Sequence, residues 1–141
     1  VTNPARLQML QGGLNLISHT NLDFFNDHQK AELIRLKGDF LCQLNRVDHA
    51  NRAYSEAAQI SNGYGKNWLS WGELCEAVFN SAPQTVAQGK QALSCYLQAL
   101  HFRYQGGVAR LLVPRVLWLL SKDDDSQTLA KEFERLAPKL P

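Results

Sequence analysis

Apolar side chains recur along this chain at intervals of three and four residues, the spacing that places them on one face of an α-helix. The first such face carries Leu7, Leu10, Leu14 and Ile17, and it follows Asn3, a residue suited to cap a helix start. The pattern predicts seven helices, over residues 4–17, 27–44, 47–60, 66–79, from 83–86 to about 104, about 108–120, and from 125 or 126 until Pro138.

A repeat of small and aromatic residues is superimposed on this pattern. Gly38 is followed by Ala50, Tyr54 and Ala57 at distances of 12, 16 and 19 residues. This spacing is typical of a tetratricopeptide-type hairpin, in which glycine on the first helix lets alanine on the second approach closely. The tyrosine and the second alanine are then expected to close the gap to the neighbouring unit.

The same signature recurs 34 residues later. Gly72 is followed by Ala92, Tyr96 and Ala99, which keep their mutual spacings of four and three but arrive eight residues late. We therefore expect an insertion in the second hairpin, near residues 80–87. Three tryptophans, Trp68, Trp71 and Trp118, accompany the repeat and are expected in the core rather than on a stacking platform.

These patterns predict an all-α, tetratricopeptide-like solenoid of about seven helices, with three hairpins and one leading helix. The helix over residues 4–17 has no partner, which indicates the second half of an earlier hairpin. The chain also begins with Val1 rather than Met. We therefore expect residues 1–141 to be a single helical-repeat segment of a much larger chain.

Composition narrows the function without identifying it. The chain has 141 residues, 45% hydrophobic and 20% charged, with a net charge of +2, which is ordinary for a globular domain. This charge is too small to indicate nucleic acid or a membrane surface as a direct partner. The apolar stretch over residues 111–120 is too short to cross a bilayer. Three cysteines without a C-x-x-C pair fit reduced thiols in an intracellular compartment.

Candidate catalytic and metal-binding chemistry is weak. The histidines, at positions 19, 28, 49 and 101, have no spacing that suits a metal site, and the cysteines, at positions 42, 75 and 95, are expected to be small buried hydrophobes. Four carboxylates, Glu32, Asp39, Glu73 and Glu76, are expected on a solvated helix face rather than in acid–base roles. We therefore expect no catalytic residue, no metal and no cofactor.

A peptide clamp is the one binding mode that the sequence tests directly. Tetratricopeptide domains that hold a C-terminal carboxylate place Lys and Asn along the inner face of their first helices. That face would carry Glu32, Arg35, Asp39 and Cys42 here, followed by residues 66, 69, 73 and 76. The mixture leans acidic and does not contain the clamp.

With the repeats placed, the residues between them resemble a known family. The matching runs stay in order and cover nearly the whole chain, at residues 17–22, 30–32, 36–38, 50–54, 66–72, 92–99 and 115–124. They resemble part of the FAT region of TRRAP-like, transcription-associated pseudokinases of the phosphatidylinositol-3-kinase-related family. Two departures are Pro114, inside an expected helix, and a short loop at residues 80–84.

The resemblance implies a non-enzymatic nuclear scaffold. Such proteins sit in SAGA-type and related histone acetyltransferase complexes and receive transcription activators. This segment would pack with the rest of its solenoid around the pseudokinase, with complex subunits and activators as partners. Two alternatives remain open: the FAT-type region of an active kinase of the same family, which intact kinase motifs downstream would reveal, and a free-standing tetratricopeptide adaptor that binds peptides.

Overall fold

The structure is a computed structural model that describes residues 3–82 and 84–102. Within these residues every regular element is helical and there is no strand, as the all-α prediction requires. The elements are α1 (Pro4–His19), the 3-10 helix η1 (Leu22–Phe24), α2 (Asp27–Gln43), α3 (Val47–Ile60), α4 (Gly65–Ser81) and α5 (Val86–His101). The sixth and seventh predicted helices, together with Trp118, lie outside the described residues.

Asparagine side chains and backbone conformations define the starts of α1 and α2 and the turn between α2 and α3. Asn3 caps α1 by accepting a hydrogen bond from the Ala5 N–H at 2.9 Å. Asn26 and Gln29 form a reciprocal capping box at the start of α2, with distances of 2.8 and 3.1 Å. The turn from α2 to α3 passes through Asn45 in the left-handed region (φ 59°), which asparagine adopts more readily than most residues.

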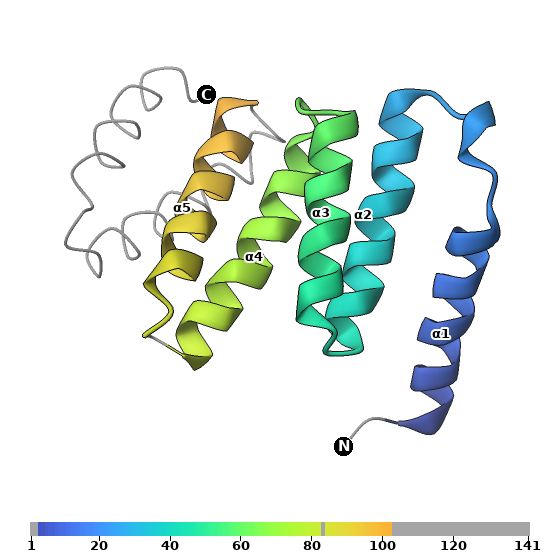
Figure 1. Ribbon diagram of the computed structural model, residues 1–141, viewed down its shortest axis with the longest axis horizontal. Coiled ribbons are helices and arrows are strands. Elements are labelled where there is room, and N and C mark those ends of the chain that lie inside the picture. Colours follow the sequence, from blue (N-terminus) through green and yellow to red (C-terminus); the bar gives the residue numbers. More distant parts are fainter. Residues whose placement is uncertain (1–2, 83, 103–141) are drawn as a thin grey trace. The chain divides into compact units, whose positions relative to one another are not determined.

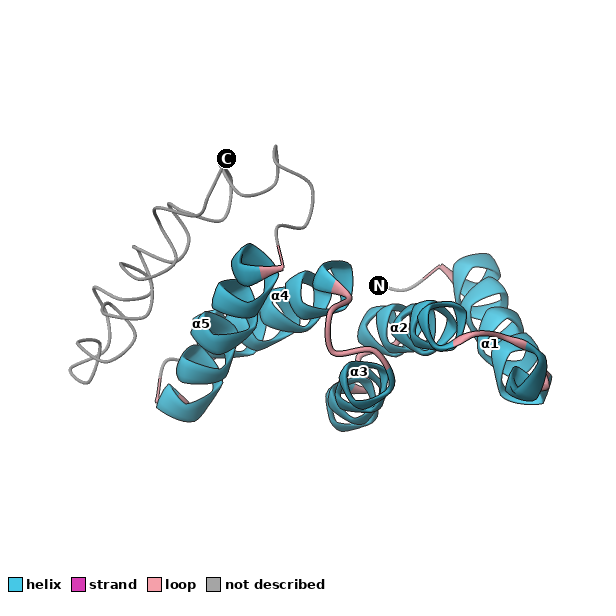
Figure 2. Cartoon of the chain, turned by 90° about the horizontal axis from the view of Figure 1, so that it is seen from above, coloured by secondary structure: helices cyan, strands magenta, loops and turns pink. Residues whose placement is uncertain are grey.

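The described residues divide into two compact units, with the boundary between residues 62 and 63. In the first, α2 and α3 form an antiparallel hairpin, and α1 packs on α2 (Figures 1 and 2). Gly13 marks the crossing of α1 and α2, because a Cβ added there would lie 2.8 Å from the Phe40 ring. The neighbouring Gly12 takes no part in this crossing, because a Cβ added there would meet no atom within 4 Å.

In the second unit, α4 and α5 form another antiparallel hairpin (Figure 1). Its core is built from both helices and consists of Cys75, Phe79, Ala92, Leu93, Tyr96, Leu97, Ala99 and Leu100. Trp68, Leu69 and Trp71 are partly buried against this core. The pairings of α2 with α3 and of α4 with α5 are the two hairpins that the repeat signature predicts.

Some local expectations were wrong. Residues 18–26 were expected to form a loop, but α1 continues to His19 and residues 22–24 form a 3-10 helix. Phe24 is an aromatic residue on that short helix, yet it is 86% exposed. Helix α4 was expected over residues 66–79, but it begins one residue earlier, at the buried Gly65, and continues to Ser81. The spacing of apolar residues does not fix where a helix begins or ends to within one or two residues. It also does not show whether an apolar side chain in a connection is buried or exposed.

Candidate functional site

Both hairpins are held by the same close contact between a glycine and a tyrosine ring. A Cβ added at Gly38 on α2 would lie 2.6 Å from Cε1 of Tyr54 on α3. A Cβ added at Gly72 on α4 would lie 2.6 Å from Cε1 of Tyr96 on α5. Real Cβ atoms do not approach other atoms this closely, so each tyrosine ring occupies the space that only glycine leaves open.

The other residues of the signature surround these contacts. Ala50, Ala57 and Ala92 are fully buried, and Ala99 is 1% exposed. Trp68 and Trp71 are partly buried and stack on each other with ring centroids 5.7 Å apart. The tryptophan pair therefore covers the core of the second unit from its edge.

The eight-residue delay in the second signature, which predicted an insertion near residues 80–87, comes mostly from longer helices on either side of the connection. The α4–α5 connection spans residues 82–85, only one residue longer than the α2–α3 connection at residues 44–46. Four of the remaining seven residues extend α4 beyond Gly72, and three extend α5 before Tyr96. The glycine–tyrosine contact is thus preserved while it moves about one helical turn away from the connection.

Each buried tyrosine hydroxyl donates a hydrogen bond to a carboxylate on the glycine-bearing helix. Tyr54 Oη donates to Asp39 Oδ1 at 2.5 Å, and Tyr96 Oη lies 3.3 Å from both carboxylate oxygens of Glu76. Asp39 is one residue after Gly38, whereas Glu76 is four residues after Gly72. The corresponding position in the first hairpin is Cys42, whose Sγ lies 3.4 Å from Tyr54 Oη.

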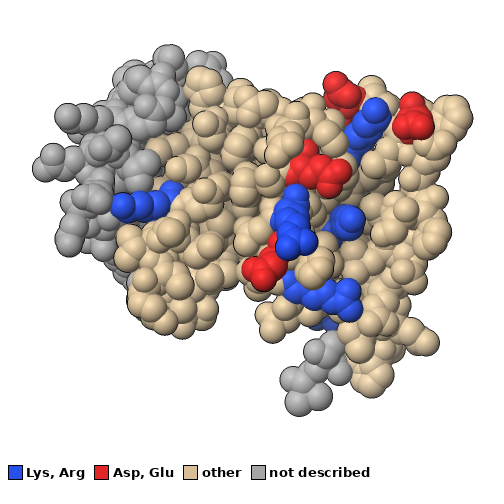
Figure 3. Space-filling view, viewed as in Figure 1, with Lys and Arg blue, Asp and Glu red and all other residues tan. Residues whose placement is uncertain are grey.

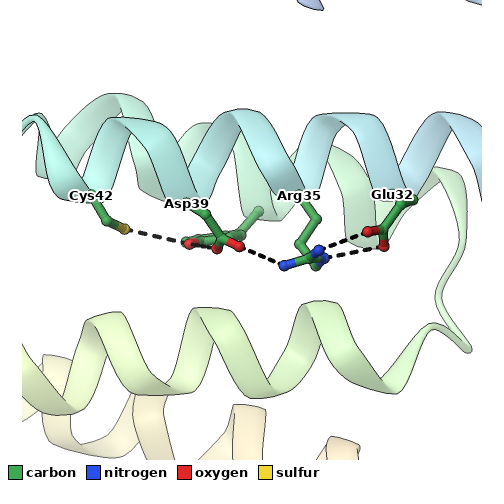
Figure 4. A network of polar contacts seen from close by, with 5 residues as sticks. Glu32, Arg35, Asp39 and Cys42 are labelled. Atoms are coloured by element: carbon green, nitrogen blue, oxygen red, sulfur yellow. Dashed lines mark hydrogen bonds and ion pairs between the residues drawn. The ribbon is translucent and has the colours of Figure 1, made fainter. Parts of the chain in front are cut away.

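Asp39 also belongs to an ion-pair network that runs along α2 (Figure 4). The guanidinium of Arg35 donates two hydrogen bonds to Glu32, at 2.7 and 3.2 Å, and one to Asp39 Oδ2 at 2.5 Å. The Arg35 side chain is 5% exposed, and the two carboxylate side chains are 33% and 31% exposed. The network therefore neutralises the buried cation of Arg35 and connects it, through Asp39, to Tyr54 on α3.

Burial and hydrogen bonding shift the protonation equilibria of this network. Burial raises the pKa of the Tyr54 hydroxyl above its ordinary value of 10.0, and the hydrogen bond to Asp39 raises it further. Burial alone would lower the pKa of Arg35, but the hydrogen bond to Glu32 and the charges of Asp39 and Glu32 outweigh it and raise that pKa. Tyr54 stays neutral and Arg35 stays charged across the physiological range.

The Tyr54→Phe variant is expected to reduce the loss of stability at alkaline pH. Above pH 10 or so the unfolded tyrosine releases its proton while the folded one retains it, so the unfolding free energy falls by at most about 1.4 kcal/mol per pH unit. The variant has no such proton to lose. Urea unfolding followed by circular dichroism between pH 9 and 11 measures how steeply the unfolding free energy falls with pH in the wild type and in the variant. Equal slopes for the two proteins would contradict the role assigned to Tyr54.

Three of the four carboxylates differ from our expectation of a solvated helix face. Glu32 and Asp39 hold Arg35, and Glu76 is buried at 8% exposure, whereas Glu73 is exposed. Spacings of three and four residues around Arg35 carry a sequence signal for the ion pairs. That signal does not distinguish an exposed set of ion pairs from a buried one, which is why the network was missed.

The thiols are suited to packing. Cys42, Cys75 and Cys95 are free, and both Cys75 and Cys95 are fully buried. Hydrogen bonding with Cys75 and burial raise the pKa of Cys95, which keeps this thiol protonated and poorly nucleophilic.

Two further kinds of site are absent from residues 3–82 and 84–102. None of their His, Cys, Asp and Glu side chains form a group of three or more that could hold a metal ion. No helix in this part of the chain has the length and apolar character needed to cross a membrane. What the described residues do contain is two hairpins with repeated internal contacts.

The sequence profile of the FAT domain matches residues 2–118 of this chain. The chain is 43% identical to the SAGA complex/NuA4 acetyltransferase complex subunit Tra1 of Schizosaccharomyces pombe over 132 residues. These aligned residues cover 94% of this chain and 4% of that protein. It is 39% identical over 132 residues to the Saccharomyces cerevisiae subunit TRA1, with the same coverage.

The human transformation/transcription domain-associated protein is 39% identical over 123 residues, which cover 87% of this chain and 3% of that protein. The chain therefore spans only a few per cent of the length of the relatives that it matches. Because the family profile and the identity cover most of the chain, it belongs to the FAT domain family.

Proposed function

We propose that this chain is a non-catalytic helical scaffold segment of a transcription coactivator, within a subunit of histone acetyltransferase complexes. The observation that carries the proposal is its 43% identity, over 94% of its length, to a SAGA and NuA4 subunit. The repeated hairpin architecture supports the same reading, because helical repeats bury a core between neighbours and present long surfaces to partners.

The polar groups of the described residues also support a structural role. Asp39 and Glu76 accept hydrogen bonds from buried tyrosines, and Arg35 is held by two carboxylates. A catalytic carboxylate needs access to a substrate and a pKa matched to its task. Here the carboxylates serve the packing of the hairpins.

The finer features of the proposal follow from the resemblance and the relatives' names. The segment would belong to a much larger nuclear protein, pack with the remaining solenoid around a pseudokinase domain, and help to receive transcription activators. The residues of the repeat signature would act as its structural determinants: Gly38, Ala50, Tyr54, Ala57, Trp68, Trp71, Gly72, Ala92, Tyr96, Ala99 and Trp118.

Affinity purification of the intact protein from nuclear extract tests this function. We expect acetyltransferase subunits to co-purify, identified by mass spectrometry, and the eluate to acetylate histones. We expect no phosphate transfer from ATP to peptide substrates under the same conditions, with an active kinase as the control. Recovery without acetyltransferase subunits, or with kinase activity that depends on the protein's own kinase-like domain, would overturn the proposal.

A further inference from the structure

A groove of about 650 Å³ lies within the first unit, outside the network described above. Seen end-on, α2 lies between α1 and α3 (Figure 2), so these two helices form the walls and α2 contributes to the floor. The α1 wall presents Gln11, Asn15 and Ser18, spaced four and three residues apart on one helix face. These amide and hydroxyl groups can both donate and accept hydrogen bonds.

The α3 wall is basic. Arg46, His49 and Arg52 follow one another at three-residue intervals and are all exposed, and Lys37 joins them from α2. Glu56 is the one acidic residue in the lining. Figure 3 shows Lys and Arg side chains, interspersed with Asp and Glu side chains, on the face that α1, α2 and α3 share.

These cations differ from Arg35 in what surrounds them. Arg35 is held by two carboxylates. Within residues 3–82 and 84–102, the side chains of Lys37, Arg46 and Arg52 form no ion pair and no hydrogen bond. Lys37, Arg46 and Arg52 outnumber Glu56 in this lining, and the excess positive charge on one concave surface attracts a partner with negative charge.

We infer that this groove, between α1 and α3, is a docking site for an acidic peptide segment of a partner protein. On α3 the rise from Arg46 to Arg52 is about 9 Å. A bound helix with carboxylates one or two turns apart would meet both arginines, with Lys37 reaching it from the floor. Buried apolar side chains of Leu14 and Leu41 also contribute to the lining, so small apolar residues of the peptide can pack between its charges.

The lining favours a peptide over a compact polyphosphate. The cations are distributed along two helices rather than converging on one point, and Glu56 would repel a dense anion at its end of the groove. A peptide can place a basic residue against Glu56 while its carboxylates contact Arg46 and Arg52. The α1 amides then provide hydrogen bonds to its polar groups.

This inference goes beyond the scaffold role and does not depend on it. The scaffold rests on the packed glycine and tyrosine positions, whereas the groove residues Arg46 and Arg52 are exposed and take no part in the core. The protein could assemble into its complex without binding a peptide here, and the reverse also holds. The two experiments therefore fail independently.

Photo-crosslinking on the intact protein tests the groove. The probe is a synthetic fluorescent peptide of 20 residues that is helical, carries glutamates three or four residues apart, and contains one benzophenone side chain. Crosslinks are mapped by mass spectrometry, and binding is followed by fluorescence anisotropy. We expect crosslinks within residues 11–18 and 46–56, and we expect the yield there to fall as salt is raised.

Arg46→Glu is expected to lower the yield in the groove about tenfold. Its position immediately before α3 tolerates a negative charge, because the helix dipole favours one there. The matched control is Lys30→Glu, the same charge reversal on α2 outside the groove, which should change the yield less than twofold. Arg52→Gln is a second variant that keeps the test valid if the first disturbs the fold, and it should also reduce the yield severalfold.

Several results would overturn the assignment. Crosslinks absent from both ranges would exclude the groove, and equal losses in Arg46→Glu and Lys30→Glu would indicate general charge attraction. Inhibition by inorganic tripolyphosphate below the peptide's own dissociation constant would identify a polyphosphate pocket instead. A peptide with glutamine at every glutamate must bind at least tenfold more weakly; equal binding would remove the role of charge.

Discussion

Replacing Tyr96 with alanine is expected to destabilise the α4–α5 hairpin by about 3–5 kcal/mol, the usual range for deleting a fully buried aromatic ring. Tyr96 is completely buried and lies against Gly72, so its removal leaves a cavity that the glycine cannot fill. The loss also leaves the buried Glu76 carboxylate without the tyrosine hydroxyl beside it. Both effects act in the same direction.

Hydrogen exchange of the intact protein, resolved to peptides by mass spectrometry, measures this effect at the hairpin itself. Peptides from α4 and α5 should lose most of their protection. The control is Tyr96→Phe, which keeps the ring and removes the hydroxyl, and it should cost only about 1 kcal/mol because the hydrogen bonds are long, at 3.3 Å. Equal losses for alanine and phenylalanine would show that ring packing is not what holds the hairpin.

The helix pairing could be predicted from the sequence because the contact itself is encoded in residue size. Glycine, alanine and tyrosine at fixed spacings leave few ways for two helices to meet, and the predicted α2–α3 pairing forms. The contact itself differs from the expectation: the space beside Gly38 is filled by the Tyr54 ring of the same hairpin, where we expected the close approach of an alanine. The second signature was harder to interpret. A delay of eight residues looks the same in sequence whether it lengthens a loop or adds a turn to both helices, and the structure shows the latter.

The polar features could not be predicted in the same way. Arg35 with Glu32 and Asp39 has the spacing of an ordinary surface ion pair, and its burial depends on how the helices pack. The groove residues come from three helices, so no single periodic pattern connects Gln11 with Arg52. Such sites form only when separate helix faces come together.

Gly38→Ala is expected to destabilise the α2–α3 hairpin by about 1–3 kcal/mol through overpacking. The new methyl group would lie 2.6 Å from the Tyr54 ring, which is 2% exposed and held by Asp39, so the ring has little room to move. Alanine is the better helix former by about 1 kcal/mol. The steric cost must therefore exceed that gain for the variant to lose stability.

Gly12→Ala is the matched control for this steric argument. It makes the same substitution inside a helix of the same unit, but a Cβ at Gly12 meets no atom within 4 Å. The variant therefore keeps the gain in helix propensity without the clash. It should stabilise α1 by about 0.5–1 kcal/mol.

The comparison of these two glycine variants tests most directly the claim that close glycine–tyrosine contacts hold this scaffold together. The measurement is peptide-resolved hydrogen exchange of the intact protein. Our account predicts opposite signs: weaker protection across residues 27–60 in Gly38→Ala, and unchanged or stronger protection across residues 4–19 in Gly12→Ala. Equal or increased protection of residues 27–60 in Gly38→Ala would contradict the account.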